Sequence, residues 1–271
     1  MPVASVGGIN LYYEIKGRGD PLLLIMGYGF SSSHWFVIRD RLSEEYRVIL
    51  FDNRGTGRSD KPDMPYTAKM MAGDVVGLID VLGIGAANVF GISMGGMIAQ
   101  EFALSYPKYL KNLILGCTSC GGPKAVQISP DAVALWRDPD WTNQSEEEKA
   151  LGTVPWLCNQ DFIDNNPAVF KRFIAIFTEY PTPQHSLVSQ MNVLMTFDSY
   201  DRLPQITAPT LVICGARDRL MPSENSKILA SRIPGAELSI IENAEHAFIT
   251  DSADESARII LQFLKKHSKH G

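Results

Sequence analysis

The sequence predicts an α/β fold in which a mostly parallel sheet is flanked by helices on both faces. Short runs rich in Val, Ile and Leu are typical of strands that are buried on both sides. Six such runs are PLLLIMG (21–27), YRVILFD (46–52), ANVFGIS (87–93), LKNLILGC (110–117), APTLVICG (208–215) and AELSIIE (236–242). Helical patterns separate most of them, and strands that alternate with helices indicate a mainly parallel sheet.

Four helices are expected around this sheet. Residues 66–82 and 96–105 carry apolar residues near i, i+3, i+4 spacing. Segment 222–233 opens with Pro and Ser, which favour the start of a helix. Segment 254–269 ends the sequence with an amphipathic pattern.

One long stretch interrupts the alternation of strands and helices. Between residues 121 and 202 no good strand pattern occurs, and three aromatic-rich segments have a helical pattern: 131–141, 162–180 and 185–197. An insertion after a strand lies over the crevice at the carboxyl ends of the strands, where open α/β sheets bind ligands. We therefore expect a core formed by residues 1–120 and 203–271, and a helical cap, or lid, formed by residues 121–202.

Composition excludes several classes of function. The 271 residues are 45% hydrophobic and 20% charged, with a net charge of −5, so no basic face for a nucleic acid is expected. No apolar run reaches the roughly 18 residues of a membrane span. The first residues show no basic and apolar signal segment, so we expect a cytoplasmic location without membrane association. The sequence does not distinguish a monomer from a homodimer.

Gly91-Ile92-Ser93-Met94-Gly95 fits the G-x-S-x-G nucleophile elbow. A serine on a very tight turn between a strand and a helix adopts a strained backbone, and side chains two residues away on either side would collide. A strand pattern precedes this motif and a helical pattern follows it. The sequence therefore predicts Ser93 as a nucleophile at the start of a helix.

A serine hydroxyl needs a general base, and that base needs an orienting acid. In this kind of site the chain order is Ser, acid, His. His246 directly follows the last predicted strand, whereas the other histidines precede the serine, lie in the predicted lid or lie in the polar tail: His34, His185, His267 and His270. Asp218 follows the strand 208–215, and Asp198 and Asp201 do not follow a strand. We predict His246 as the base and Asp218 as the acid, with a helix cap as the alternative role of Asp218.

Acyl transfer also needs N–H donors for the developing oxyanion. The N–H of Met94, directly after the serine, is one expected donor. The loop Gly27-Tyr28-Gly29 follows an early strand, and the N–H of Tyr28 is the other. Glycine-rich loops after strands also occur for purely structural reasons.

With these segments in place, the sequence resembles the α/β-hydrolase superfamily over nearly its whole length, in particular its serine carboxylesterases and enol-lactonases. The matching segments are MGYG (26–29), DNRGTGRS (52–59), GISMGG (91–96), GARD (215–218) and EHAF (245–248). The resemblance implies a mostly parallel sheet with one antiparallel strand near its start, a lid, and no cofactor or metal. It also implies that Arg54 braces loops rather than binding substrate.

Two positions depart from the superfamily pattern. Met26 stands where a histidine is usual before the first glycine, so the hydrogen bonds that brace this loop are expected to differ. Glu245 stands where a glycine usually precedes the histidine. A carboxylate that pointed inward would favour protonated His246, but we expect a solvated side chain.

Cys117 and Cys120 form a C-x-x-C pair, and the chain has four cysteines in all. Such a pair is typical of a redox site or of half a metal site, but a second half is missing from the sequence. We therefore expect two small, buried residues at a strand end.

The superfamily resemblance with Ser93, rather than Asp, at the elbow favours acyl transfer over dehalogenation or epoxide hydrolysis. The expected activity is hydrolysis of neutral, small-to-medium carboxylic esters. Enol-lactonase, C–C bond hydrolase and perhydrolase activities use the same residues, and a ligand receptor in signalling is the alternative from another class.

The preference for neutral esters rests on the predicted lid. Its aromatic residues predict a mainly apolar pocket: Trp136, Trp141, Trp156, Phe162, Phe170, Phe173, Phe177 and Phe197. A buried carboxylate would need a paired cation. Lys171 and Arg172 are adjacent and are not both expected to face inward, and the remaining cations are expected to be solvated: Lys124, Arg137 and Lys149.

Overall fold

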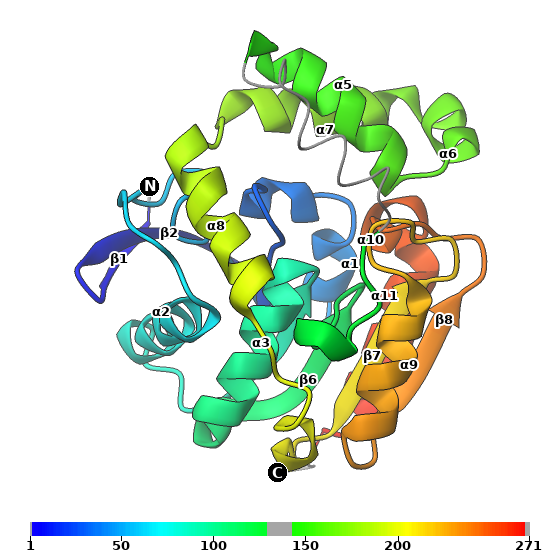
Figure 1. Cartoon of the computed structure of the whole chain (residues 1–271). Coiled ribbons are helices and arrows are strands. Elements are labelled where there is room, and N and C mark those ends of the chain that lie inside the picture. The colour runs from blue at the N-terminus through cyan, green and yellow to red at the C-terminus, as the bar shows by residue number, and fades with distance from the viewer. Residues whose placement is uncertain (1, 129–142, 269–271) are drawn as a thin grey trace.

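A computed structural model of the chain describes residues 2–128 and 143–268 (Figure 1). The described residues form a sheet in the order β1-β2-β4-β3-β5-β6-β7-β8. Its strands are β1 (Val3–Val6), β2 (Ile9–Lys16), β3 (Pro21–Ile25), β4 (Arg47–Phe51), β5 (Ala87–Ile92), β6 (Leu110–Gly116), β7 (Thr210–Gly215) and β8 (Glu237–Ile241). β2 pairs antiparallel with both β1 and β4, and the other pairs are parallel. The six predicted strands and the mostly parallel sheet are confirmed.

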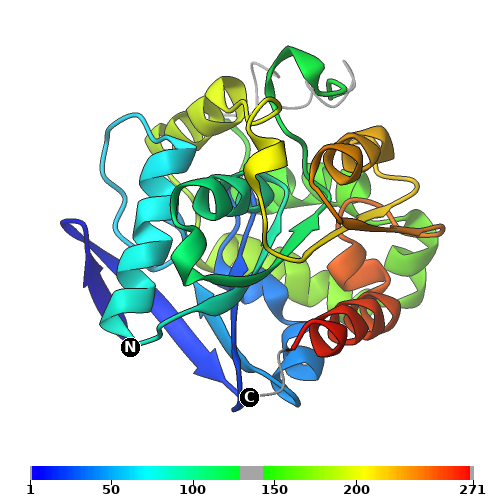
Figure 2. The ribbon, with the colours of Figure 1, turned by 90° about the horizontal axis from the view of Figure 1, so that it is seen from below.

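Helices cover both faces of this sheet (Figure 2). They are α1 (Arg39–Ser43), α2 (Ala68–Val81), α3 (Met94–Ser105), α5 (Glu146–Leu157), α6 (Gln160–Asn165), α7 (Pro167–Glu179), α8 (Gln184–Thr196), α9 (Ser223–Arg232), α10 (Phe248–Asp251) and α11 (Ala253–Lys266). Alternate residues of β3 enter two separate cores. Leu23 packs in the core with α2, α3 and α9, and Leu22 packs in the core with α1 and α11.

Helices α5 to α8 occupy the predicted lid, between β6 and β7, and α5, α6 and α7 lie above the sheet in Figure 1. The helix predicted over 162–180 is interrupted, because α6 ends at Asn165 and α7 begins at Pro167. Asn166 has φ −129°, and a residue before proline is disfavoured in the helical conformation. The segment predicted over 131–141 lies outside the described residues, and the division of the chain at residues 121 and 202 stays a prediction.

No helix in the described ranges 2–128 and 143–268 has the length and apolar character needed to cross a bilayer.

Candidate active site

Ser93 occupies the turn between β5 and α3, with φ 53° and ψ −124°. This conformation is rare for a residue with a side chain. A Cβ atom on Gly91 would lie 2.2 Å from the carbonyl oxygen of Gly95, and one on Gly95 would lie 2.2 Å from that of Ile25. The turn therefore needs both glycines, as the sequence predicts, and it fixes Ser93 at the carboxyl end of a central strand.

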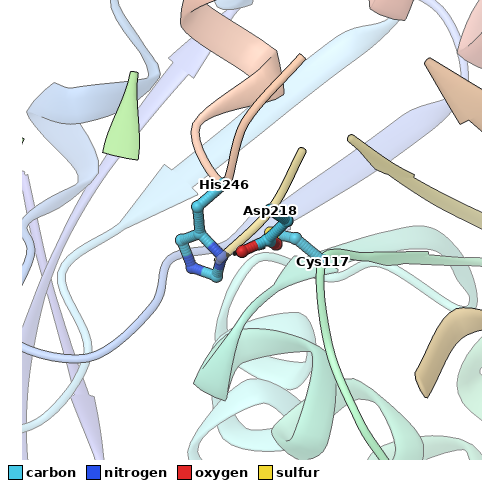
Figure 3. Close-up of side chains that lie close together, drawn as sticks. All are labelled: Cys117, Asp218 and His246. Carbon is cyan, nitrogen blue, oxygen red and sulfur yellow. Dashed lines mark hydrogen bonds and ion pairs between the residues drawn. The ribbon is translucent and has the colours of Figure 1, made fainter. Parts of the chain in front are cut away.

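His246 and Asp218 lie in direct contact (Figure 3). His246 Nδ1 is 2.8 Å from Asp218 Oδ2. Asp218 Oδ1 accepts hydrogen bonds from the N–H groups of Leu220, at 2.9 Å, and Met221, at 2.8 Å. Because the carboxylate accepts, Nδ1 carries the proton of neutral His246, and Nε2 is left as an acceptor. Asp218 does not cap α9, whose N-cap residue is Pro222.

Ser93 and His246 line the same cavity, which has a volume of about 330 Å³. Within the described part of the chain, Ser93 Oγ makes no hydrogen bond to His246. In active sites of this kind that bond is often long and tightens only in the substrate complex. The structure therefore brings together Asp218 and His246, and it places Ser93 in the wall of the cavity that His246 also lines.

The two predicted oxyanion donors belong to segments beside Ser93. Met94 is the first residue of α3, so its N–H has no acceptor within the helix. Tyr28 lines the cavity, and a Cβ atom on the preceding residue, Gly27, would lie 3.6 Å from Ser93 Oγ. The backbone of the loop 26–29 therefore passes close to the serine hydroxyl.

The loop 26–29 is braced by residues that sequence reasoning missed. Asn53 Nδ2 donates to the carbonyl of Met26 at 2.8 Å. Gly29 is held twice, because its N–H donates to Gln190 Oε1 at 2.8 Å and its carbonyl accepts from Thr182 Oγ1 at 2.9 Å. Gln190 and Thr182 belong to the predicted lid segment, far from Gly29 in sequence, and no local pattern marks these contacts.

Arg54 lies outside the cavity lining. Its Nε and one terminal nitrogen donate to the two carboxylate oxygens of Asp74, at 2.6 and 2.5 Å. Both side chains are buried. These contacts brace the loop after β4 against α2, in agreement with the expected structural role.

Cys117 directly follows β6 with φ 38°, and it lies beside the His246–Asp218 pair (Figure 3). One sulfur, oxygen or nitrogen atom from each of these three residues lies within 4.8 Å of the others. Burial raises the pKa of the Cys117 thiol well above its usual range, which favours the protonated form. Cys120 is not part of this group. Cys117 and Cys120 are buried, as expected, and all four cysteines are free.

The cavity wall is mainly apolar. The apolar and aromatic residues that the predicted lid segment contributes include Phe173, Phe177, Tyr180, Leu187, Val188, Met191 and Leu194. Of the described aromatic residues that were predicted to form an apolar pocket, Phe173 and Phe177 line it, whereas the others pack elsewhere: Trp156, Phe162, Phe170 and Phe197. Trp136 and Trp141 lie outside the described residues.

His34 is another side chain of the cavity wall. Its Nδ1 lies 3.2 Å from the carbonyl oxygen of Ser31, and burial lowers the pKa of the ring to about 3. His34 is therefore neutral at physiological pH. Its sequence position before Ser93 excluded it as the base, and the structure shows that it contacts Ser31 and neighbouring aromatic rings instead.

The expectation that Lys149 is solvated is wrong. Its side chain is only 14% exposed, lines the cavity and pairs with Glu146 at 2.8 Å. Lys149 lies on the face of α5 that lines the cavity, which is why its side chain is buried. Lys124 is exposed, as expected, and Arg137 lies outside the described residues. Lys171 and Arg172 are both exposed, which agrees with the expectation that they do not both face inward.

The expectation that Glu245 is solvated is also wrong. Glu245 is 8% exposed, and its Oε2 is buried and has no hydrogen-bond partner among the described residues. Arg219 Nε lies 3.7 Å away from this oxygen, and burial raises the pKa of the carboxyl group. The loop is drawn inward because its backbone packs on Gly215, where a Cβ atom would lie 2.2 Å from the carbonyl oxygen of Ala244.

This fold and this site can be compared with known proteins. Residues 22–259 match the Alpha/beta hydrolase family. The chain therefore belongs to the alpha/beta hydrolase family. It is 30% identical, over 97% of its length and 98% of the other chain, to a protein of Azorhizobium caulinodans named as a carbamate hydrolase, RutD.

Two solved structures are similar over nearly the whole chain. The enol-lactonase from Burkholderia xenovorans LB400 is 27% identical, with a TM-score of 0.86 over 97% of this chain and 100% of that one. A thermophilic esterase from Thermogutta terrifontis is 28% identical, with a TM-score of 0.84 over 99% of each chain. Membership of this family and these relatives identify the chain as a hydrolase.

Proposed function

We propose that this hydrolase cleaves neutral, small-to-medium carboxylic esters through an acyl-enzyme intermediate. The observation that carries the proposal is the contact between His246 and Asp218 at the wall of the cavity that also contains Ser93. A strained serine, an oriented imidazole and a buried carboxylate are the parts that acyl transfer requires.

In the proposed reaction, Ser93 Oγ attacks the ester carbonyl carbon while His246 Nε2 takes the hydroxyl proton. Asp218 holds Nδ1–H and stabilises the imidazolium that forms. The N–H groups of Tyr28 and Met94 bind the oxyanion. His246 then protonates the leaving alcohol, and a water molecule that His246 deprotonates releases the acid and restores Ser93.

The size and chemistry of the cavity support neutral substrates. A volume of about 330 Å³ lies at the lower end of the usual range for small-molecule sites. Its largely apolar wall favours uncharged acyl groups, because a charge moved from water into it loses hydration. The similarity to a solved esterase supports the same class of substrate.

A carboxylate-bearing lactone or an anionic carbamate is the second candidate substrate. Lys149 in the cavity wall favours it, because an ammonium group there could pair with an anionic substrate. The similarity to an enol-lactonase supports the lactone, and the similarity to RutD supports the carbamate. Glu146 neutralises Lys149 in the structure, so we place neutral esters first.

The test is a substrate panel assayed with the wild-type protein and Ser93→Ala. The panel contains p-nitrophenyl esters from acetate to decanoate, a carboxylate-bearing lactone, a carbamate and a β-diketone. We expect repeated turnover of esters, with kcat/KM that rises over the first acyl carbons and then falls. A lactone or carbamate preferred by a hundredfold or more would replace the ester proposal, and a single slow turnover would favour a ligand receptor.

A further inference from the structure

Helix α5 presents one continuous face to the cavity. Four of its residues line the cavity, at relative positions i, i+3, i+7 and i+11: Glu146, Lys149, Thr153 and Leu157. Residues at this spacing lie on the same side of an α-helix. The face is charged at the start of the helix and apolar at its end.

The apolar end of this face lies beside the proposed base. The N–H of Ala247, which follows His246, donates to the carbonyl of Leu157 at 2.7 Å. At 1.5 Å per residue, Lys149 lies about 12 Å and Glu146 about 16 Å along the helix from Leu157. The charged end is therefore remote from the reacting atoms but belongs to the same cavity.

The helix holds the charged end in place. A capping box fixes the start of α5, with Ser145 N–H bonded to Glu148 Oε2 at 2.7 Å and Glu148 N–H bonded to Ser145 Oγ at 3.2 Å. The carboxylate of Glu146 lies in the first helical turn, where the helix dipole favours a negative charge. The Glu146–Lys149 pair is thus a fixed feature of the cavity wall.

The pair has unused hydrogen-bonding capacity. Lys149 Nζ carries three donors, and in the described part of the chain Glu146 Oε1 is its one hydrogen-bond partner. The lysine side chain is 14% exposed and the glutamate side chain 33%. The two charges cancel, so the pair presents both donors and acceptors without a net charge.

We propose that Glu146 and Lys149 bind the remote end of the substrate, and that this end is an uncharged group that both donates and accepts hydrogen bonds. A hydroxyl group or a primary amide has this chemistry. A carboxylate at the same place would face Glu146, and a methyl group would cover the ammonium without satisfying it. This inference rests on the proposed ester hydrolysis and extends it to the class of acyl chain.

The test compares p-nitrophenyl esters of equal length that end in a hydroxyl, a methyl or a carboxylate group. Acids of four to twelve carbon atoms cover the distance to the pair, because an extended chain advances about 1.2 Å per bond. The wild-type protein should prefer the hydroxyl over the methyl ending by about tenfold in kcat/KM for the long acids. The hydroxyl and methyl endings of the four-carbon acids should differ little, because a short chain does not reach the pair.

Two substitutions should change the preference among the three endings in different ways. Lys149→Met should abolish the preference for the hydroxyl ending. Glu146→Gln should raise kcat/KM for the long ester that ends in a carboxylate by about tenfold, because the ammonium is then unpaired. Glu147→Gln, on the exposed side of the same helix, is the matched control and should leave all preferences unchanged. Thermal unfolding checks that each variant folds.

Binding of the same esters to Ser93→Ala separates this inference from the proposed function. The dissociation constants of Ser93→Ala should still favour the ester with the hydroxyl ending. This preference should vanish in the double variant that carries Ser93→Ala and Lys149→Met. Equal binding of hydroxyl and methyl endings, or a wild-type preference for the carboxylate, would overturn the proposed site. Selective binding without turnover of any ester would instead overturn the proposed function alone.

Discussion

The side chain of Gln190 accepts a hydrogen bond from the N–H of Gly29 at 2.8 Å. Its amide nitrogen donates to the carbonyl of Arg54 at 3.0 Å, and the side chain is fully buried. Both ends of the amide are therefore used, and they join α8 to two loops of the sheet. Gly29 directly follows Tyr28, so the position of α8 helps to set the geometry of the proposed oxyanion donor.

Gln190 is predicted to be a positioning residue for the oxyanion donor at Tyr28. Gln190→Ala should lower kcat by about tenfold with little change in KM. This is less than the 10²–10³ typical for loss of a donor itself, because the N–H remains but is less well held. Gln190→Glu keeps the acceptor for Gly29 and should retain more activity.

Asn192→Ala is the matched control for this prediction. Asn192 lies on the same helix and donates to the carbonyl of Tyr66 at 2.9 Å, away from the loop 26–29. Steady-state kinetics and thermal unfolding of both variants give the comparison. If Asn192→Ala lowers kcat as much as Gln190→Ala, the effect belongs to α8 as a whole and not to the contact with Gly29.

Asp218→Asn should lower kcat by about 10⁴, as in trypsin-like enzymes. The asparagine can still accept from the N–H groups of Leu220 and Met221, so the fold should persist. Its amide group would favour the wrong tautomer of His246. Circular dichroism and ester kinetics check the prediction, and activity within tenfold of wild type would exclude Asp218 as the orienting acid.

Asp251 should make stability depend on pH. Burial raises its pKa from 3.8 to about 6, and no residue in the described part of the chain forms a hydrogen bond with its buried Oδ1. Because the folded value exceeds the unfolded one, the folded state binds the proton more tightly between pH 4 and 6. Protonated Asp251 therefore makes a contribution to the unfolding free energy that is fully present below pH 4. This contribution is lost as pH rises through about 6.

Asp251→Asn should therefore unfold at a higher temperature than wild type at pH 8 and at nearly the same temperature at pH 4. The difference in unfolding free energy at pH 8 has an upper bound of about 3 kcal/mol, from 1.36 kcal/mol for each pH unit. Asp254→Asn, whose side chain is 85% exposed, is the control. Equal stabilisation at both pH values would show that charge burial is not the cause.

Gly91→Ala should destabilise the fold because its Cβ atom would overlap the carbonyl of Gly95 at 2.2 Å. Overpacking at a rigid turn typically costs about 1–3 kcal/mol. Gly85→Ala is the control, because no atom of residues 2–128 or 143–268 lies within 4 Å of a Cβ atom there. Urea unfolding measures the stability of both variants. Similar unfolding midpoints for Gly91→Ala and Gly85→Ala would show that the turn relaxes around the added Cβ atom.

The sequence reveals the central strands because continuous Val, Ile and Leu runs mark burial on both faces. It does not reveal β1 and β2 in the same way, since their burial alternates or fades along each strand. Residues directly after strands, such as Asp218 and His246, were predictable because the topology alone brings strand ends to one edge.

The environments of Lys149 and Glu245 could not be predicted, because they depend on how a helix and a loop pack against the sheet. The contact between Gln190 and Gly29 spans 161 residues and leaves no local pattern. Such long-range contacts between polar side chains and backbone are fixed only by the tertiary structure.

Covalent labelling with a fluorophosphonate tests the central claim, that Ser93 is the nucleophile, most directly. Peptide mapping by mass spectrometry should find one adduct per chain, on Ser93, and none on Ser31, which lines the same cavity. Ser93→Ala should not be labelled and should lose about 10⁶ in kcat, by analogy with the subtilisin serine. An adduct on another residue, or ester hydrolysis retained by Ser93→Ala, would contradict the proposed mechanism.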